Sequence, residues 1–200
     1  LLKSKPAVIC TFHTGSYRVL NLLLAKLKIP FTLVISKGVA EKEGPIFRSL
    51  FQELPGTEKQ ERFQLIYAEA SSSGLQMLRE LKAGRSLVLY IDGNTGAGTA
   101  TTKNDNRCVV DFLQQQLYAR KGIAYLAHVA KVPVLTVACY RKTWEDIRLR
   151  FFEPVMPTVE KERELFARST TQHIYGLAAP MIQEYPEQWE GWLYLHKVAR

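Results

Sequence analysis

Short apolar runs alternate with longer stretches of mixed polarity along most of this chain, and that alternation restricts the fold more than any other feature. Each run is rich in valine, isoleucine, leucine or aromatic residues and is bounded by polar or turn-forming residues, as buried strands are. The stretches between the runs have the periodicity of helices. The pattern predicts a single α/β domain over residues 1–200, an α/β sandwich whose mostly parallel central sheet is flanked by helices. The predicted strands are Pro6–Phe12, Phe31–Ser36, Phe63–Ala68, Ser86–Ile91 and Val132–Cys139.

Helices are predicted between these strands, and two further segments complete the outline. At Ile147–Phe152 apolar residues alternate with Arg148 and Arg150, which indicates an edge strand with one solvated face. The segment 93–106 is rich in glycine, threonine and asparagine and predicts a long loop, and long loops in compact domains are often functional. The predicted helices are Ser16–Leu27, Pro45–Glu53, Ser72–Leu81, Leu117–Lys131 and Val159–Glu184, the last with a kink at Pro180.

The length and composition are those of one globular domain. The chain has 200 residues, of which 46% are hydrophobic and 23% charged, which is enough apolar material for a sizeable core. No apolar run reaches the ~18–20 residues that a membrane-spanning helix needs, and no signal peptide is visible. Because the chain begins with leucine rather than methionine, an N-terminal membrane-anchoring segment upstream of it stays open.

The cysteines indicate the redox compartment. Cys10, Cys108 and Cys139 are odd in number and widely spaced, and this pattern fits neither a disulfide framework nor a zinc site. We therefore expect buried thiols in a reducing compartment and no metal site.

Positive charge is concentrated in two quarters of the chain. The net charge is +8; residues 1–50 carry eight lysines and arginines against two acidic residues, and residues 101–150 carry nine against four. A basic surface attracts an acidic partner, which could be nucleic acid, an anionic membrane, an acidic carrier protein or a phosphorylated substrate. The alternative is a basic surface that only aids solubility.

Polar or charged residues follow four of the predicted strands. His13 follows the first strand, Lys37 the second, Asp92 the fourth and Arg141 the fifth. Ligands of parallel α/β sheets bind beyond the carboxyl ends of the strands, and the topology brings these ends to one edge. The sequence therefore predicts a site that contains these residues.

His13 is the candidate general base, because the pKa of an unperturbed imidazole lies near neutrality. Gly15 and Ser16 suit a tight strand-to-helix turn with a polar cap. At the start of a helix the dipole disfavours the cation, which would keep the imidazole neutral and basic. The alternative is a histidine that only caps this turn. A Cys10–His13 thiol and base pair is disfavoured, because Cys10 lies within the predicted strand.

The glycine-rich stretch G-N-T-G-A-G-T, which begins at Gly93 and Asn94, resembles a phosphate-cradling loop. It does not match G-x-x-x-x-G-K-[ST], and no G-x-G-x-x-G is present, so a nucleotide site is poorly supported. We expect a loop that covers a substrate, with Gly93 and Asn94 in contact with that substrate. The aromatic and basic C-terminal run, E-Y-P-E-Q-W-E-G-W-L-Y-L-H-K-V-A-R, suits either a membrane interface or a tail that packs on the domain.

Several of these stretches together resemble a known family. The chain resembles the bacterial late acyltransferases of lipid A synthesis, the lauroyl/myristoyl transferase group within the lysophospholipid acyltransferase superfamily. The resemblance covers nearly all 200 residues, and it rests on the order and spacing of five stretches rather than on any one of them. They are F-H-T-G-S-Y, L-K-A-G-R-S-L-V-L-Y-I-D-G-N, V-V-D-F-L, G-I-A-Y-L-A-H-V-A-K-V-P-V-L-T-V-A-C-Y-R and Y-P-E-Q-W-E-G-W-L-Y-L-H-K.

The resemblance implies a His-x4-Asp/Glu motif in which the carboxylate orients the histidine, and here the chain departs from the pattern. His13 matches the motif histidine, but the fifth residue after it is Arg18, which has no atom that accepts a hydrogen bond. Three readings stay open. Another acceptor such as Asp92, Asp111 or a backbone carbonyl orients His13; or Arg18 binds an anionic substrate group in a specialised enzyme; or the site is inactive and the domain binds lipid or acts as a scaffold.

The resemblance also implies roles for three other residues. Arg141 matches an arginine that stabilises charge or binds an acceptor phosphate, with a surface salt bridge as the alternative. Lys37 matches, less securely, a basic residue of the acceptor-binding motif. Asp92 matches an aspartate that shapes the site, with a turn-forming Asp-Gly as the alternative.

The implied activity is transfer of a fatty acyl group from a thioester of acyl carrier protein or coenzyme A to a hydroxyl or amino acceptor, with His13 as general base. It implies no tightly bound cofactor, no metal and no nucleic-acid partner. It implies peripheral attachment to the cytoplasmic side of the bacterial inner membrane, or a cytoplasmic protein. A hydrolase that releases the acyl group to water is a third reading beside the lipid-binding or scaffolding domain.

Overall fold

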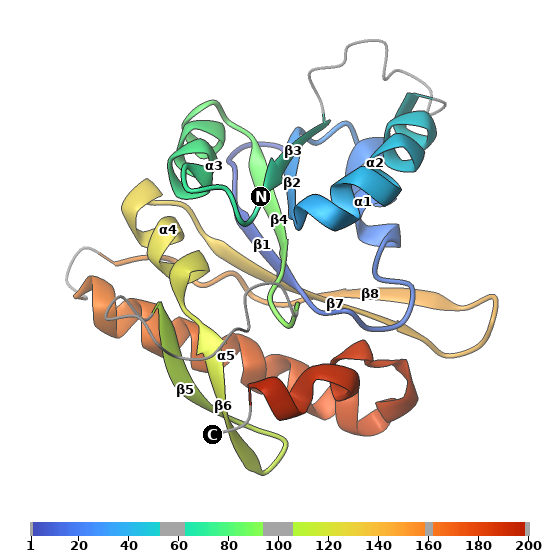
Figure 1. Cartoon of the computed structure of the whole chain (residues 1–200), viewed down its shortest axis with the longest axis vertical. Coiled ribbons are helices and arrows are strands. Elements are labelled where there is room, and N and C mark those ends of the chain that lie inside the picture. The colour runs from blue at the N-terminus through green and yellow to red at the C-terminus, as the bar shows by residue number, and fades with distance from the viewer. Residues whose placement is uncertain (1, 53–62, 94–105, 159–161, 199–200) are drawn as a thin grey trace.

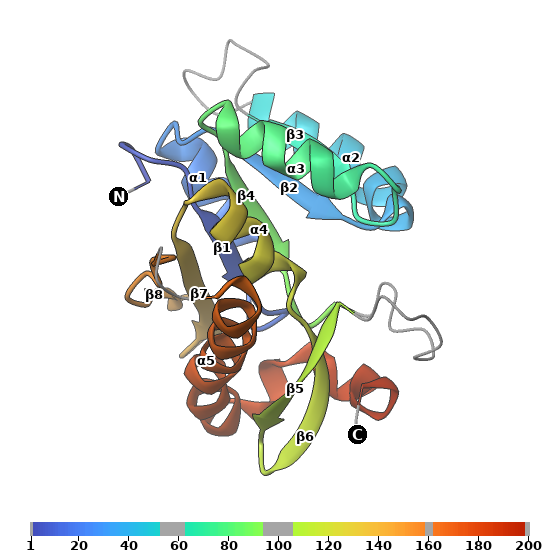
Figure 2. The same ribbon diagram turned by 90° about the vertical axis from the view of Figure 1, so that its left-hand side faces the viewer.

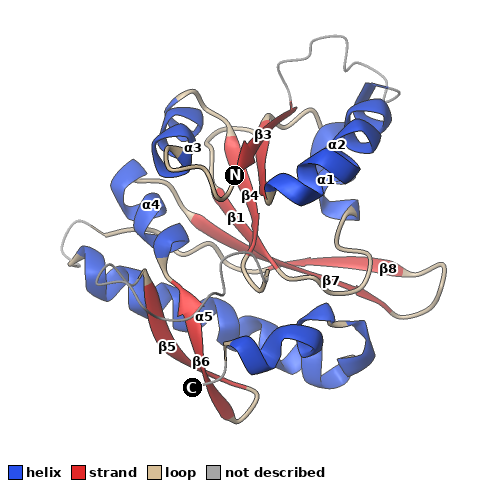
Figure 3. Ribbon diagram, viewed as in Figure 1, coloured by secondary structure: helices blue, strands red, loops and turns tan. Residues whose placement is uncertain are grey.

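The computed structural model describes residues 2–52, 63–93, 106–158 and 162–198. At its centre lies a six-stranded sheet with the strand order β3-β2-β4-β1-β7-β8 (Figures 1 and 3). The first five strands are parallel and β8 is antiparallel at one edge, so the predicted mostly parallel α/β sheet is confirmed. The strands are β1 Val8–Thr11, β2 Phe31–Ile35, β3 Phe63–Tyr67, β4 Ser86–Tyr90, β7 Val134–Arg141 and β8 Ile147–Phe151.

Helices cover both faces of this sheet because successive side chains of a strand point to opposite sides. On β1, Ile9 belongs to the apolar cluster that α1 and α2 complete, whereas Val8 and Cys10 belong to the cluster that α3, α4 and α5 complete. Figure 2 shows α3, α4 and α5 on the side that faces the viewer. The helices are α1 Val19–Lys26, α2 Lys37–Gln52, α3 Ser73–Lys82, α4 Gly122–Ala130 and α5 Arg163–Glu184.

A two-stranded hairpin lies where the sequence predicted part of a helix. Strands β5 (Arg107–Phe112) and β6 (Gln115–Arg120) pair antiparallel and pack on α5, so the predicted helix Leu117–Lys131 is wrong over its first residues. The turn between them consists of Leu113 and Gln114, with φ of 50° and 65°. Hairpin turns with two positive φ values normally use asparagine or glycine, which is why the sequence carries no turn signal here.

Two helix starts also differ from the prediction. The α2 helix begins at Lys37 rather than Pro45, so Pro45 lies inside it. The α1 helix begins at Val19 rather than Ser16, and no side chain caps it. The predicted start of the last helix, Val159, lies outside the described residues, and α5 begins at Arg163 and contains Pro180.

The C-terminal segment continues past α5 as two short 3-10 helices, η2 (Pro186–Gln188) and η3 (Glu190–Lys197). It runs back to the carboxyl edge of the sheet, where Thr14 forms an isolated antiparallel bridge with Trp189. Trp189 is buried, so this part of the aromatic C-terminal run packs on the domain. Within the described residues, no helix has both the length and the apolar character that crossing a bilayer requires.

Candidate active site

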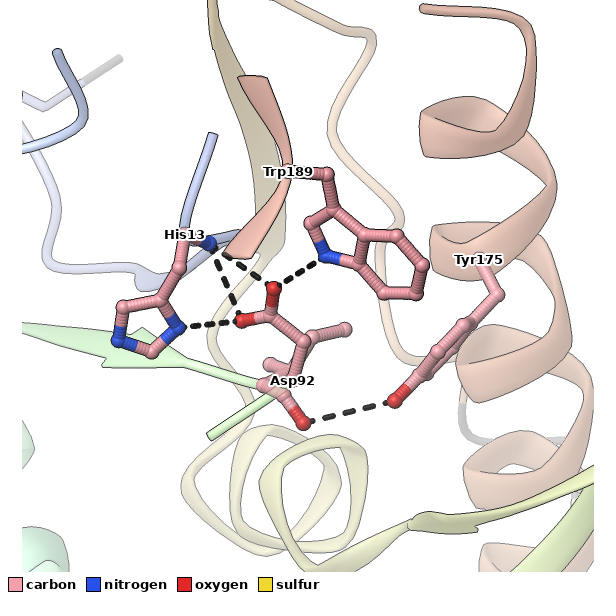
Figure 4. A network of polar contacts seen from close by, with 5 residues as sticks. His13, Asp92, Tyr175 and Trp189 are labelled. Atoms are coloured by element: carbon pink, nitrogen blue, oxygen red, sulfur yellow. Dashed lines mark hydrogen bonds and ion pairs between the residues drawn. The ribbon is translucent and has the colours of Figure 1, made fainter. Parts of the chain in front are cut away.

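His13 and Asp92 meet at the carboxyl edge of the sheet. Strands β1 and β4 are parallel neighbours in which Thr11 pairs with Tyr90, so His13 and Asp92 each stand two residues beyond a paired position. The His13 Nδ1 lies 2.7 Å from Oδ1 of Asp92. Because a carboxylate only accepts hydrogen bonds, Nδ1 carries the proton in this pair and Nε2 keeps a free lone pair. Figure 4 shows Nε2 on the side of the ring that points away from Asp92.

The Asp92 carboxylate is held from three directions. Besides the imidazole, it accepts the backbone N–H of His13, at 2.9 Å to Oδ2, and the indole Nε1–H of Trp189, at 2.7 Å to Oδ2. Its side chain is only 3% exposed. The Tyr175 hydroxyl donates to the carbonyl of Ile91, the residue before Asp92, at 3.4 Å (Figure 4). The hydrogen bonds to the Asp92 carboxylate are charge-assisted, and such bonds are short and strong, so Asp92 holds the imidazole in one orientation and one tautomer.

A compact loop after β1 places the imidazole, and Gly15 makes the loop possible. Gly15 has a φ of +54°, and a Cβ added there would stand 2.9 Å from Cα of Tyr140 on β7. The backbone N–H of Gly15 donates to the carbonyl of Gln188, and the backbone N–H of Glu190 donates to the carbonyl of His13. The C-terminal segment therefore clamps the loop that carries His13.

We predict that Gly15→Ala destabilises the protein. The new methyl group meets the backbone of Tyr140 and Cys139 as well as the side chain of Gln188, and the positive φ is strained for alanine, so the free energy of unfolding should fall by about 1–3 kcal/mol. Chemical denaturation measures this loss. Gly176→Ala on α5 is the matched control, because a Cβ there has no neighbour within 4 Å, and it should be neutral or stabilising. Equal effects of the two substitutions would contradict the prediction.

The indole of Trp189 gives a second prediction. Trp189→Phe keeps an aromatic ring but removes the donor to the buried carboxylate, so the free energy of unfolding should fall by about 1.5–3 kcal/mol. Denaturation is again the measurement. Trp192→Phe is the control: this half-exposed indole donates to the carbonyl of Pro186 and should cost less. A larger loss for Trp192→Phe than for Trp189→Phe would show that Asp92 does not depend on the indole.

A large groove opens beside His13. Its volume is about 830 Å³, within the range of small-molecule sites. Apolar side chains from β2, β4, α2, α3 and α4 form much of its wall, and polar side chains gather near the imidazole. The apolar lining includes Ile35, Val39, Phe47, Met77, Leu89, Ile123 and Leu126, and the polar lining includes His13, Tyr17, Arg18, Glu43, Arg120 and Glu190.

The surroundings of His13 raise its pKa above the ordinary value. Burial is the largest single influence and lowers the pKa of His13, but the hydrogen bond and charge of Asp92, with the charge of Glu190, together outweigh it. The nearby Arg18 opposes them slightly. The predicted dipole effect is wrong, because α1 begins only at Val19 and His13 lies in the preceding loop. The imidazole is therefore a stronger base than a free histidine side chain.

Two tyrosines enclose the imidazole. The rings of Tyr17 and Tyr90 lie 4.9 Å and 4.8 Å from the His13 ring, centroid to centroid. Burial, the main cause, raises the pKa of Tyr17 to about 12, so its hydroxyl stays protonated at neutral pH. The Tyr90 hydroxyl accepts a hydrogen bond from the amide of Asn21 at 3.0 Å. These contacts limit the freedom of the base.

Arg18 lies on the rim of the groove and is already engaged. Its Nε and terminal nitrogen donate to the two carboxylate oxygens of Glu43 on α2, at 3.0 Å and 2.7 Å. The guanidinium also lies over the ring of Tyr17. A substrate anion would have to compete with Glu43, so the expectation that Arg18 binds an anionic group stays a prediction.

Of the other predicted site residues, Lys37 and Arg141 lie at the same edge but not beside His13, whereas Gly93 does lie beside it. Lys37 starts α2, is well exposed, and has Glu41 3.9 Å away. The guanidinium of Arg141 lies over the ring of Trp144, and neither it nor Lys37 lines the groove. Gly93 does line the groove, and a Cβ there would come within 3.6 Å of the imidazole. Asn94 lies outside the described residues, as does most of the predicted loop 93–106.

Two other reactive groups that the sequence suggested, Cys10 and Asp111, do not join this site. Cys10 is fully buried, and burial raises the pKa of its thiol, in agreement with the predicted buried cysteine. Asp111, an alternative partner for His13, lies on β5, where its backbone pairs with Gln172 of α5. Among the residues that the structure describes, no three histidine, cysteine, aspartate or glutamate side chains converge as metal ligands.

A scan of the chain against models of known protein families finds no match, and a search of curated proteins finds no significant relative. The assignment of a function therefore depends on the geometry of this site and on the resemblance of the sequence motifs.

Proposed function

We propose that the chain is an acyltransferase that moves a fatty acyl group from a thioester to a hydroxyl or amino acceptor. The observation that carries the proposal is the contact of His13 with Asp92 at the mouth of the groove. The missing carboxylate of the His-x4-Asp/Glu pattern is then replaced by one from a neighbouring strand. Asp92 accepts a hydrogen bond from the Nδ1–H of His13 at 2.7 Å, which leaves Nε2 as the base.

The reaction uses His13 twice. Nε2 takes the proton of the acceptor hydroxyl or amine while the acceptor atom attacks the thioester carbonyl and forms a tetrahedral intermediate. The intermediate collapses, the carbon–sulfur bond breaks, and the leaving thiolate receives a proton from the imidazolium. Asp92 keeps its negative charge throughout and stabilises the imidazolium while it exists. The raised pKa of His13 favours the first proton transfer.

The lining of the groove supports a fatty acyl substrate. Its apolar wall, which includes Phe47, Met77 and Leu126, suits a hydrocarbon chain, because burial of each CH₂ group contributes roughly 0.8 kcal/mol. The polar end, near His13 and Arg18, suits the thioester and the acceptor. Acyl carrier protein, coenzyme A and a membrane surface are proposed partners on the same grounds as the activity. The cytoplasmic side of the bacterial inner membrane is the proposed location.

Acyl transfer can be tested with radiolabelled lauroyl-coenzyme A and lauroyl carrier protein as donors. Lysophosphatidylethanolamine is the probe acceptor, because it offers both a hydroxyl and an amino group. Labelled diacyl or N-acyl product that accumulates faster than in a reaction without protein supports the proposal. The donor that reacts faster identifies the preferred carrier.

Two outcomes contradict the proposal in different ways. Free laurate that forms at the same rate with and without acceptor indicates a hydrolase. A labelled donor that binds but yields neither product nor free laurate above background, with further acceptors that carry alcohol or amine groups, indicates the lipid-binding or scaffolding domain.

A further inference from the structure

We propose that the tip of the β7–β8 hairpin, residues 141–147, is a docking surface for an anionic lipid membrane. The tip combines an exposed tryptophan with basic side chains at the edge of the sheet that carries His13. The proposed function includes contact with a membrane, and the hairpin tip is where we place that contact. Only the purpose of the contact rests on the proposed function.

The aromatic part of the tip is Trp144. Its side chain is 87% exposed, more than any other large apolar side chain in the described part of the chain. Tryptophan is highly buried on average, so a bare indole at a hairpin tip is unusual for a surface that meets only water. Ile147 at the start of β8 adds a partly exposed aliphatic group. Tryptophan side chains are enriched where protein meets the lipid headgroups, because the ring is apolar and its N–H is polar.

Basic groups surround the indole. The guanidinium of Arg141 lies 5.1 Å from the centre of the Trp144 ring, and Lys142 stands between them in the sequence. Residues 141–150 carry four basic and two acidic side chains, and one of the acidic ones, Asp146, is paired with Arg148 at 2.8 Å. Residues 141–147 themselves carry two basic and two acidic side chains, and Arg148 and Arg150 on β8 make the end of the hairpin, residues 141–150, net positive by two, which complements the phosphate headgroups of an anionic membrane.

The backbone of the tip is ordered before any partner binds. The hydroxyl of Thr143 accepts the N–H groups of Glu145 and Asp146, and the N–H of Lys142 donates to the carbonyl of Asp146 at 2.9 Å. Little conformational entropy is lost when such a turn docks, which favours binding.

The base of the hairpin is tied to the candidate active site. Gln188 accepts the N–H of Arg141 and donates to its carbonyl, both at 2.8 Å, and its own carbonyl accepts the N–H of Gly15. Figure 1 shows the hairpin extending beyond the other strands on the right. A membrane that holds the tip would therefore lie near the edge that carries His13.

Two other basic surfaces are weaker candidates for a membrane contact. Arg148 and Arg150 on β8 also protect an edge strand from pairing with another chain, but that role does not explain Trp144. The amino ends of the parallel strands, opposite the edge that carries His13, have the exposed lysines Lys3, Lys5 and Lys26 nearby. Lys26 stands at a helix C-terminus, where the dipole already stabilises it. The hairpin tip is thus the favoured contact.

Vesicle binding without any acyl donor tests the inference separately from the proposed activity. Co-sedimentation is measured with vesicles of 70% phosphatidylcholine and 30% phosphatidylglycerol, and with pure phosphatidylcholine. Trp144→Ser and Lys142→Glu should each weaken binding to the anionic vesicles about tenfold. The matched controls are Leu75→Ser, an exposed apolar residue on α3, and Lys5→Glu at the opposite edge, and both should bind as the unmodified chain does.

Fluorescence adds a second readout for the same residue. With the anionic vesicles, the emission of the unmodified chain should shift to shorter wavelength, and Trp144→Ser should lose most of that shift. The inference is overturned if Lys5→Glu weakens binding more than Lys142→Glu does. It is also overturned if Trp144→Ser binds unchanged, or if the tip variants bind vesicles normally and instead lose binding to an acidic carrier protein.

Discussion

His13→Ala is expected to reduce acyl transfer by about 10³-fold, the typical contribution of a positioned general base. Among the described residues, His13 is the group in contact with Asp92 that can take a proton from the acceptor, and the substitution removes it while leaving the apolar groove wall in place. The initial rate of labelled product, with saturating lauroyl donor and lysophosphatidylethanolamine, measures the loss. Binding of the donor should change little, because the apolar wall that holds the chain is unaltered.

The control for this substitution is His173→Ala, which removes an exposed imidazole on α5. It should retain the full rate of transfer. Because His13 is part-buried, circular dichroism must show that the His13→Ala chain is folded before its rate is interpreted. If the folded variant transfers acyl groups at the unmodified rate, His13 is not the base and the proposed mechanism fails.

Asp92→Asn is expected to have the second largest effect, also about 10³-fold in transfer rate. The carboxylate accepts from His13 Nδ1, His13 N and Trp189 Nε1, whereas an asparagine side chain offers one oxygen and presents an NH₂ group to the remaining donors. An NH₂ group that faces Nδ1 favours the tautomer with the proton on Nε2, which removes the base. Asp111→Asn, at a carboxylate on β5, is the matched control and should retain the rate.

The pH dependence separates this electrostatic role from simple damage. In the unmodified chain the raised pKa of His13 places the acid limb of kcat/KM above the ordinary imidazole value of about 6.5. Without the charge of Asp92, the burial that lowers the pKa of His13 dominates, so the acid limb of Asp92→Asn should move to lower pH. An unchanged acid limb with a reduced plateau would mean that the charge of Asp92 does not control the imidazole.

The raised pKa of His13 should also make the stability of the fold depend on pH. Because the pKa of His13 is raised in the folded state, its protonation stabilises the fold, fully so below about pH 6.5. This contribution disappears as the pH rises through the raised value. The stability difference between the unmodified chain and Asp92→Asn should therefore be larger at mildly acidic pH than at pH 9. Denaturation at both pH values measures it, and a difference that grows with pH would contradict the prediction.

The parallel sheet could be predicted because its strands are buried on both faces. Val8–Thr11 on β1 and Ser86–Leu89 on β4 are buried at every position, so they are recognisable as continuous apolar runs. The β5–β6 hairpin was missed because its turn, Leu113-Gln114, has none of the residues that normally adopt positive φ. The start of α2 was missed because Gly38, Gly44 and Pro45 lower the helix propensity of a segment that tertiary packing nevertheless makes helical.

The location of the candidate site could be predicted from the sequence, but most of the contacts between its side chains could not. That His13 and Asp92 share an edge follows from the parallel topology, but their pairing depends on β1 and β4 being neighbours in register, which no local pattern encodes. Lys37 lies apart from His13 because β4 separates β2 from β1. Arg141 lies apart because it stands five residues beyond Thr136, the partner of Cys10, whereas His13 stands only three residues beyond Cys10. Trp189 carried no signal, since an indole in an aromatic run looks the same whether it holds a carboxylate or only fills space.

His13 and Asp92 are 79 residues apart, and that separation determines when the proposed catalytic pair can form during synthesis. A nascent chain contains the imidazole before the carboxylate that orients it, because three strands and three helices of the described structure lie between them, and Trp189 follows Asp92 by a further 97 residues. Contacts between distant segments form late, because the entropy of closing the long span must be overcome first. A chain that stops before Asp92 should therefore lack an oriented imidazole, and one that stops before Trp189 should lack the indole that holds the carboxylate.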